Sequence, residues 1–140
     1  MREHTARGIY LFGPCVLVSA HISEPFCILP GGHIEANEHA EQALRREWLE
    51  EVGMPLTAVM PLTTIQSVWY RGGDLTGDRV DEQMALFVVR MGQPPGEGIM
   101  RLGEADLRFR WAVLGNLPQE HLVPLEVIPW VIRAAGGRYG

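Results

Sequence analysis

The chain has 140 residues, of which 46% are hydrophobic, and this suits one domain over residues 1–140 with a sizeable core. Its formal net charge of -5 argues against a nucleic-acid scaffold or an anionic membrane surface as the main partner. The 12 basic residues are all arginine, so a P-loop is excluded and any phosphate group must be bound by arginine or backbone amides.

The N-terminal region predicts an apolar strand over about Tyr10 to Ala20. Arginines precede this stretch and Val18-Ser19-Ala20 is typical of a signal-peptide cleavage site, so secretion is an alternative. However, Gly13-Pro14 interrupts the stretch, and no run approaches the roughly 20 apolar residues of a membrane-spanning helix. We therefore expect a cytoplasmic protein with no membrane partner. Cys15 and Cys27 lie in strand-like runs and are expected to be free, buried thiols.

A second strand, over Phe26 to Leu29, is expected to lead through a glycine-rich turn at Gly31-Gly32 into a helix. The helix should run from about Glu38 to Val52, because Asn37 is a favourable N-cap and Gly53 follows an unbroken run of helix formers. Apolar side chains recur along it at steps of four and predict its buried face: Ala40, Leu44, Trp48 and Val52, with Ala43 and Leu49 beside them.

Three carboxylates should project from another patch of this helix, because Glu47 lies three and four residues before Glu50 and Glu51. One interpretation is an ordinary solvated face, in which Arg46 pairs with Glu50. The other is a cation site, since clustered like charges repel one another unless a cation lies among them. Oxygen ligands of this kind suit Mg2+ or Mn2+.

The rest of the chain predicts strands, two long loops and a last helix. The two loops, Arg71 to Glu82 and Gly92 to Glu104, are candidate substrate elements. The expected strands are Thr57 to Tyr70 with a break at Pro61, Gln83 to Met91, and Leu107 to Val113, and the helix covers part of Leu122 to Ala135 between the limits set by Pro124 and Pro129.

The segment from Gly32 to Met54, GHIEANEHAEQALRREWLEEVGM, matches a known motif at every specified position. Its Gly32, Glu38, Arg46, Glu47, Glu50, Glu51 and Gly53 are spaced as in the Nudix box, so the chain resembles the Nudix hydrolases. This resemblance implies an α+β fold of the Nudix type, an α/β/α sandwich with a central mixed β-sheet. It also implies that the Gly31 carbonyl, Glu47, Glu50 and Glu51 bind the metal, that Arg46 orients the carboxylates, and that Glu38 supports the site.

Four further residues are candidates for the site. Some Nudix enzymes supply another glutamate from the position that Glu104 occupies, as a metal ligand or catalytic base; the alternative is a solvated loop acid. Tyr70 lies near the position where dinucleoside polyphosphate hydrolases of the family carry a tyrosine, and Arg71 follows it as a candidate phosphate contact. His33, inside the box, is a candidate substrate contact.

The function that the resemblance implies is hydrolysis of the pyrophosphate linkage of a nucleoside diphosphate joined to another moiety. Candidate substrates are nucleoside triphosphates, ADP-ribose, nucleotide sugars and dinucleoside polyphosphates. The alternative is a noncatalytic Nudix-like module that binds a nucleotide or a partner protein; such modules usually lack a box glutamate, and this chain keeps all of them. The expected partner is a small nucleotide-type molecule, and a homodimer is a candidate assembly.

Overall fold

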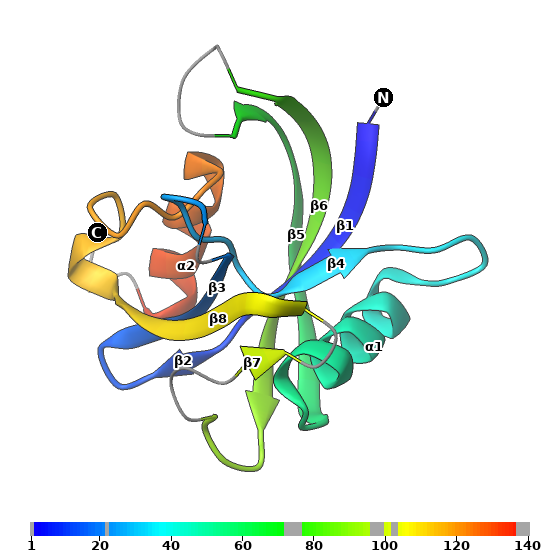
Figure 1. Ribbon diagram of the computed structural model, residues 1–140. Coiled ribbons are helices and arrows are strands. Elements are labelled where there is room, and N and C mark those ends of the chain that lie inside the picture. The colour runs from blue at the N-terminus through cyan, green and yellow to red at the C-terminus, as the bar shows by residue number, and fades with distance from the viewer. Residues whose placement is uncertain (1, 22, 72–76, 96–99, 102–103, 137–140) are drawn as a thin grey trace.

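In the part of the chain that the structure describes, two four-stranded sheets lie between two helices (Figure 1). The computed structural model describes residues 2–21, 23–71, 77–95, 100–101 and 104–136, and for residues 100, 101 and 104–106 it describes the backbone alone. The first sheet has the order β4-β1-β6-β5, with strands β4 (Gly31–His33), β1 (Arg2–Ile9), β6 (Arg79–Met91) and β5 (Leu56–Tyr70). The second has the order β2-β3-β8-β7, with strands β2 (Leu11–Phe12), β3 (Cys15–His21), β8 (Glu104–Val113) and β7 (Met100–Arg101).

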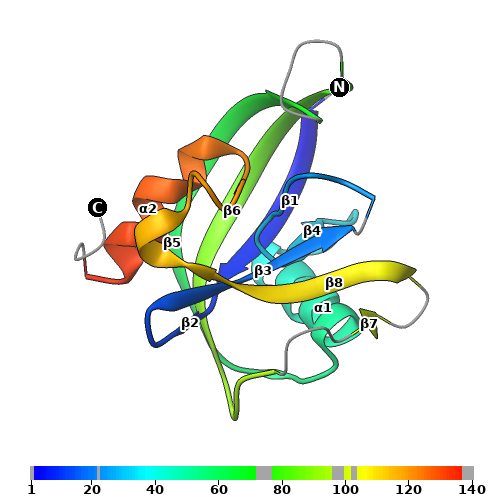
Figure 2. The same cartoon turned by 60° about the vertical axis from the view of Figure 1, so that its left-hand side comes forward.

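The first sheet is mixed, as predicted. Strands β1 and β6 run parallel, whereas β4 pairs with β1 and β5 with β6 in the antiparallel sense. Helix α1 (Ala40–Val52) and helix α2 (Ile128–Ala134) lie on opposite sides of the strands (Figures 1 and 2). The predicted α+β class, with helices flanking a central mixed sheet, is therefore confirmed.

Each helix covers its own hydrophobic core. The cluster under α1 is centred on Trp48, which is fully buried, and the cluster under α2 includes Val131 and Ile132. Strand β6 contributes to both, since Met84 and Leu86 pack in the α2 cluster and Phe87, Val89 and Met91 in the α1 cluster. The apolar face predicted for α1 is confirmed at Ala43, Leu44, Trp48 and Val52, but Leu49 is exposed.

The strand predicted over Tyr10 to Ala20 is in fact a hairpin of β2 and β3, because Gly13 adopts φ 57° in a turn with Pro14. The preceding strand, β1, was not predicted. Its sequence REHTARGI is rich in charge, which is unusual for a strand at the centre of a sheet. The charges are tolerated because they are paired, as Arg2 is with Asp81 and Arg7 with Glu82.

The region between β3 and α1 also differs from the prediction. Residues Phe26 to Leu29 form isolated bridges, not a strand, through Cys27 and Ile28. The glycine pair Gly31-Gly32 lies in strand β4, not in a turn, and is paired with Arg7 and Ala6 of β1. Gly31 has φ 146°, and a Cβ there would lie 2.1 Å from the Ala6 carbonyl oxygen, so only glycine permits this close pairing.

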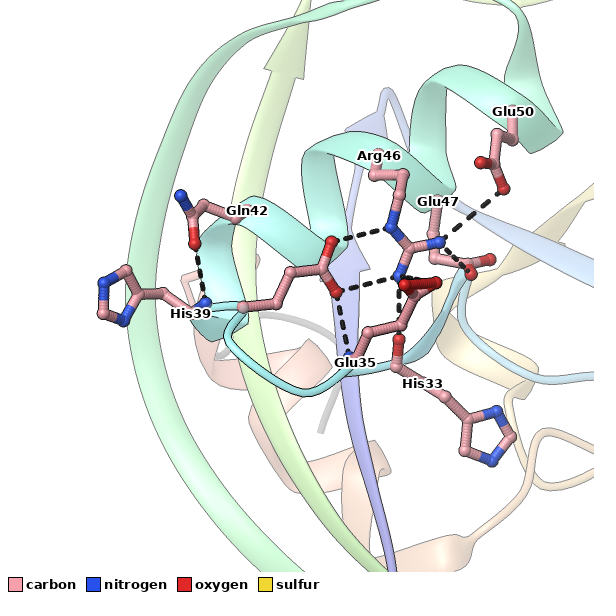
Figure 3. Close-up of polar contacts among 8 residues, drawn as sticks. His33, Glu35, His39, Gln42, Arg46, Glu47 and Glu50 are labelled. Atoms are coloured by element: carbon pink, nitrogen blue, oxygen red, sulfur yellow. Dashed lines mark hydrogen bonds and ion pairs between the residues drawn. The ribbon is translucent and has the colours of Figure 1, made fainter.

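Helix α1 begins later than predicted, at Ala40, and Glu38 lies outside it. Asn37 has φ 68° and does not cap the helix; His39 is the N-cap, and its backbone N–H donates to the Gln42 side chain at 2.7 Å (Figure 3). The C-terminus is as predicted, because Gly53 adopts φ 85° and its N–H donates to the Leu49 carbonyl.

The second half of the chain follows the prediction with shorter loops. Strand β5 has the expected irregularity at Pro61, and β6 begins at Arg79, inside the segment predicted as a loop. Short 3-10 helices, Leu114–Asn116 and Leu125–Val127, precede α2, in which Pro129 occupies the first turn. Cys27 is a free thiol and is buried as expected, whereas Cys15 is partly exposed. In the described part of the chain, no helix is long and apolar enough to cross a membrane.

Candidate active site

Strand β4 and helix α1 form one structural unit around the glycine pair. A Cβ on Gly32 would lie 2.5 Å from the Glu47 carboxylate, so the missing side chain leaves the space in which that carboxylate lies. Gly31 is equally constrained on its other side by β1. The two glycines therefore let the backbone of β4 approach both β1 and the glutamates of α1.

Arg46 is the centre of a polar network that joins the loop before α1 to the helix itself (Figure 3). Its guanidinium donates to both oxygens of Glu38, from Nε at 2.7 Å and from Nη2 at 2.9 Å. Nη1 donates to Glu47 Oε1 at 2.8 Å, and Nη2 donates to the His33 carbonyl at 3.1 Å. The fork thus holds the Glu47 carboxylate toward β4.

The electrostatics of this network favour the charged forms of both partners. The hydrogen bonds from Arg46, aided by the Glu35 backbone N–H, lower the pKa of Glu38 from 4.5 to about 2. The same carboxylate, together with Glu47, raises the pKa of Arg46. Glu38 therefore anchors the arginine.

A polar pocket of about 270 Å3 opens beside this network. Two of the predicted carboxylates, Glu47 and Glu51, line it together with Gly31, Gly32 and His33. Glu51 is only 6% exposed, so this carboxylate is not part of a solvated helix face. The remaining lining residues come from β1, β3 and β8 and from the segment before β4: Arg7, Ser19, His21, Ile28 and Leu107.

Glu50 does not line this pocket. Its side chain is 49% exposed and lies 3.8 Å from Arg46 Nη1, the i,i+4 pairing that the sequence left open (Figure 3). Within the described residues, no three His, Cys, Asp or Glu side chains converge closely enough to form a metal cage. The structure thus brings Gly31, Glu47 and Glu51 together and places Glu50 at the outer side of the arginine.

The predicted substrate residues are dispersed. His33 lines the pocket at its exposed rim, with Nε2 2.7 Å from Glu3 Oε1. Arg71 lies 5.4 Å above the Trp69 ring and lines a second pocket of about 160 Å3, which shares Ser19, His21, Ile28 and Leu107 with the first. Tyr70 lines a third, mainly apolar pocket that adjoins the second at Phe26. Glu104 begins β8, and its side chain lies outside the described residues.

Sequence reasoning missed Arg7, Ser19 and His21 as pocket residues. Ser19 and His21 alternate along β3, which is the period at which strand residues share a face. Arg7 had a detectable signal, since a chain without lysine has only arginine side chains and backbone amides to bind phosphate, and Arg7 is one of two arginines in β1. Its position opposite Gly31, however, depends on the pairing of β1 with β4.

Comparison with known proteins agrees with this geometry. The family model described as the NUDIX domain matches residues 2–131. A MutT NUDIX hydrolase from Burkholderia pseudomallei has a similar structure, with a TM-score of 0.67 and 20% sequence identity over 95% of this chain and 97% of that one. A MutT structure from a study of Aliivibrio salmonicida and Vibrio cholerae has a TM-score of 0.66 and 21% sequence identity, and the match covers 96% of this chain and 99% of that one. A NUDIX hydrolase from Nitrosomonas europaea has a TM-score of 0.64 and 20% sequence identity, and the match covers 99% of this chain and 93% of that one. No curated protein sequence matches significantly.

Because the family model covers almost all of the chain, the chain belongs to the NUDIX domain family. It is a Nudix pyrophosphohydrolase, as the complete motif predicted. Membership implies a small-molecule substrate of the nucleotide type.

Proposed function

We propose that this enzyme hydrolyses the pyrophosphate linkage of a nucleoside diphosphate joined to another moiety, and that the reaction depends on a divalent metal. The observation that carries the proposal is the presence of Glu47 and Glu51 on one pocket with Gly31-Gly32, beside an arginine that holds Glu47 in place. The burial of Glu51 supports this reading over a solvated charge cluster.

The residues of the pocket fit a hard cation such as Mg2+ or Mn2+. Glu47, Glu51 and the Gly31 backbone offer oxygen atoms, which are the ligands that such ions prefer. Glu50 would complete the set from the next position of α1 after a rotation of its exposed side chain. When bound, such an ion neutralises charge on phosphate oxygens and lowers the pKa of a bound water.

The side chains have distinct roles in the hydrolysis. Arg46, anchored by Glu38, fixes the orientation of Glu47. A glutamate, either one on α1 or Glu104, accepts a proton from the attacking water. As the water oxygen bonds to phosphorus, the bond from phosphorus to the bridging oxygen breaks, and the leaving phosphate departs with the electron pair.

The arrangement of the pockets suggests how the substrate lies. The polar pocket receives the diphosphate, and the adjoining pocket, which Phe26 and Arg71 line, receives the nucleoside or the second moiety. His33 contacts the substrate at the rim, and Tyr70, beyond Phe26, is the candidate for stacking on a base. We infer that residues 1–140 act as one domain, since residues from β1 to β8 line the same pocket.

A substrate panel tests the proposal. Purified protein with Mg2+ or Mn2+ should release phosphate-containing products from at least one of a nucleoside triphosphate, ADP-ribose, a nucleotide sugar and a dinucleoside polyphosphate, and should lose this activity in EDTA. Binding of these compounds without product release would instead identify a noncatalytic nucleotide-binding module.

A further inference from the structure

Arg7 lies on the wall of the catalytic pocket although it belongs to neither the motif nor α1. Its position in β1 is paired with Gly31 of β4, and its side chain lines the same pocket as Gly31, Glu47 and Glu51. The side chain is 11% exposed, so it faces the pocket and not bulk water. An arginine and two carboxylates therefore line the same pocket.

A buried carboxylate holds this arginine. Arg7 Nε lies 3.3 Å from Glu82 Oε2, and Nη1 donates to the Leu29 carbonyl at 3.1 Å. Glu82, on β6, is 2% exposed, and it also accepts hydrogen bonds from Thr5 Oγ1 at 2.5 Å and Trp69 Nε1 at 3.2 Å. Strands β1, β5 and β6 thus fix the carboxylate, and the carboxylate fixes the guanidinium.

Such an arrangement is costly for a purely structural contact. A buried ion pair pays a desolvation penalty that well-packed apolar side chains avoid, so it is weak evidence for stability alone. The guanidinium has five N–H donors in a planar fork, more than the contacts to Glu82 and Leu29 require. Phosphate oxygens are the ligands that this fork matches, and the chain has no lysine to supply the charge instead.

We propose that Arg7 binds a phosphate oxygen of the substrate, and that Glu82 is the positioning residue that aims Arg7 into the pocket. The inference rests on the proposed function, because it deepens the description of the same pocket. It assigns the substrate's phosphate to the pocket that Arg7, Glu47 and Glu51 line together.

Two of the test variants avoid leaving a buried charge unpaired. The double variant Arg7→Gln/Glu82→Gln removes both charges, and Arg7→Lys keeps the positive charge but loses the fork. In Mg2+ buffer, the double variant should raise KM for the best panel substrate and Kd for inorganic pyrophosphate about tenfold or more, with a smaller change in kcat. Arg7→Lys should restore part of the loss. Glu82→Gln alone should also raise KM, because Arg7 would remain but would no longer be held in its direction toward the pocket.

Arg110→Gln is the matched control, because Arg110 pairs with Glu120 at 2.7 Å and does not line the pocket. It should lower Tm without changing KM. A folded double variant with native KM and native pyrophosphate affinity would overturn the role of Arg7, and equal KM effects in the double variant and Arg110→Gln would reduce it to a structural ion pair. If the wild-type protein is active, neither of these two results contradicts the proposed function. A wild-type protein that is inactive and binds no pyrophosphate would contradict the proposed function itself.

Discussion

Arg46 shows how one side chain organises the whole site. It contacts Glu38 before the helix, Glu47 within it and the His33 carbonyl on β4, so it links three segments by direct hydrogen bonds. Without this cation, the carboxylates of Glu38 and Glu47 would have no shared partner. The arginine therefore sets both the start of α1 and the direction of Glu47.

The Glu38–Arg46 pair predicts a pH dependence of stability. The pKa of Glu38 is lowered from 4.5 to about 2, so its contribution is complete above pH 4.5 and is lost as the pH falls from 4.5 through 2. Glu38→Gln should therefore flatten the decline of Tm over this range in metal-free buffer. The flattening is partial because the pKa of Glu120 is also lowered: burial raises it, but the Val113 N–H and Arg110 lower it more. Identical slopes for the variant and the wild type would contradict the assignment.

Arg71 gives a second prediction for a single residue. It lines the pocket that adjoins the catalytic one, so it should attract the negative charge of the substrate. Arg71→Ala should raise KM at low ionic strength by a factor that shrinks at high salt, because the ions of the buffer screen an exposed charge. Steady-state kinetics at two salt concentrations measure this, and an unchanged KM at low salt would move recognition elsewhere.

Individual residues of the motif were predictable from the sequence, but their partners were not. The structure shows the contact of Arg46 with Glu38, while the roles predicted for both residues stay predictions, and helical spacing placed Glu47 and Glu51 on one patch, which lines the pocket. Helical spacing alone could not show that Glu50 points away from the pocket that Glu47 and Glu51 line. The direction of Glu50 depends on which side of α1 packs on β4. The roles of Glu50 and Glu104 as ligand or base stay predictions.

Among the elements, the pairing of β4 with α1 builds the pocket. The close approach requires glycine at both Gly31 and Gly32, for different reasons: one faces the β1 backbone and the other faces the Glu47 carboxylate. The sequence predicted a glycine-rich turn here, yet the glycines lie in a strand. Local composition cannot distinguish these two uses of glycine, because the distinction lies in the neighbouring strand.

Gly32→Ala tests this packing. The new methyl group would lie 2.5 Å from Glu47 Oε2, and the flexible carboxylate would move before the backbone does. We expect kcat/KM to fall by roughly 10^2, the cost of a displacement near 1 Å, with little loss of Tm. Gly115→Ala is the control, since a Cβ there meets nothing within 4 Å. Native activity in Gly32→Ala would show that the position of Glu47 does not matter.

Strand β1 marks the limit of prediction for whole elements. Strands β5, β6 and β8, the C-terminus of α1 and the terminal helix were predicted because apolar periodicity and glycine signals define them locally, whereas β7 lies in the segment predicted as a loop. In β1, Thr5 is buried and Arg7 is nearly buried. The Thr5 hydroxyl donates to Glu82 of β6, and the Arg7 guanidinium pairs with the same carboxylate. Such long-range partners leave no periodic signal in the strand itself.

At the scale of the molecule, the pocket lies where the two sheets and α1 meet. Strands β1 and β4 of the first sheet, β3 and β8 of the second, and α1 all contribute lining residues. The two hydrophobic cores hold these elements in place from opposite sides of the mixed sheet. Catalytic geometry therefore depends on the complete fold, although the carboxylates come from one helix.

The most direct test of this account is the turnover of Glu51→Gln against Glu41→Gln, at saturating Mg2+ and with the best substrate of the panel. Both changes remove one carboxylate from α1, but Glu51 is buried on the pocket, whereas Glu41 is exposed and pairs with Arg45 at 3.1 Å. We predict that Glu51→Gln lowers kcat by roughly 10^2 or more while Glu41→Gln remains near the wild-type rate. Near-native turnover of a folded Glu51→Gln protein would contradict the account, because the pocket carboxylates would then have no part in the hydrolysis.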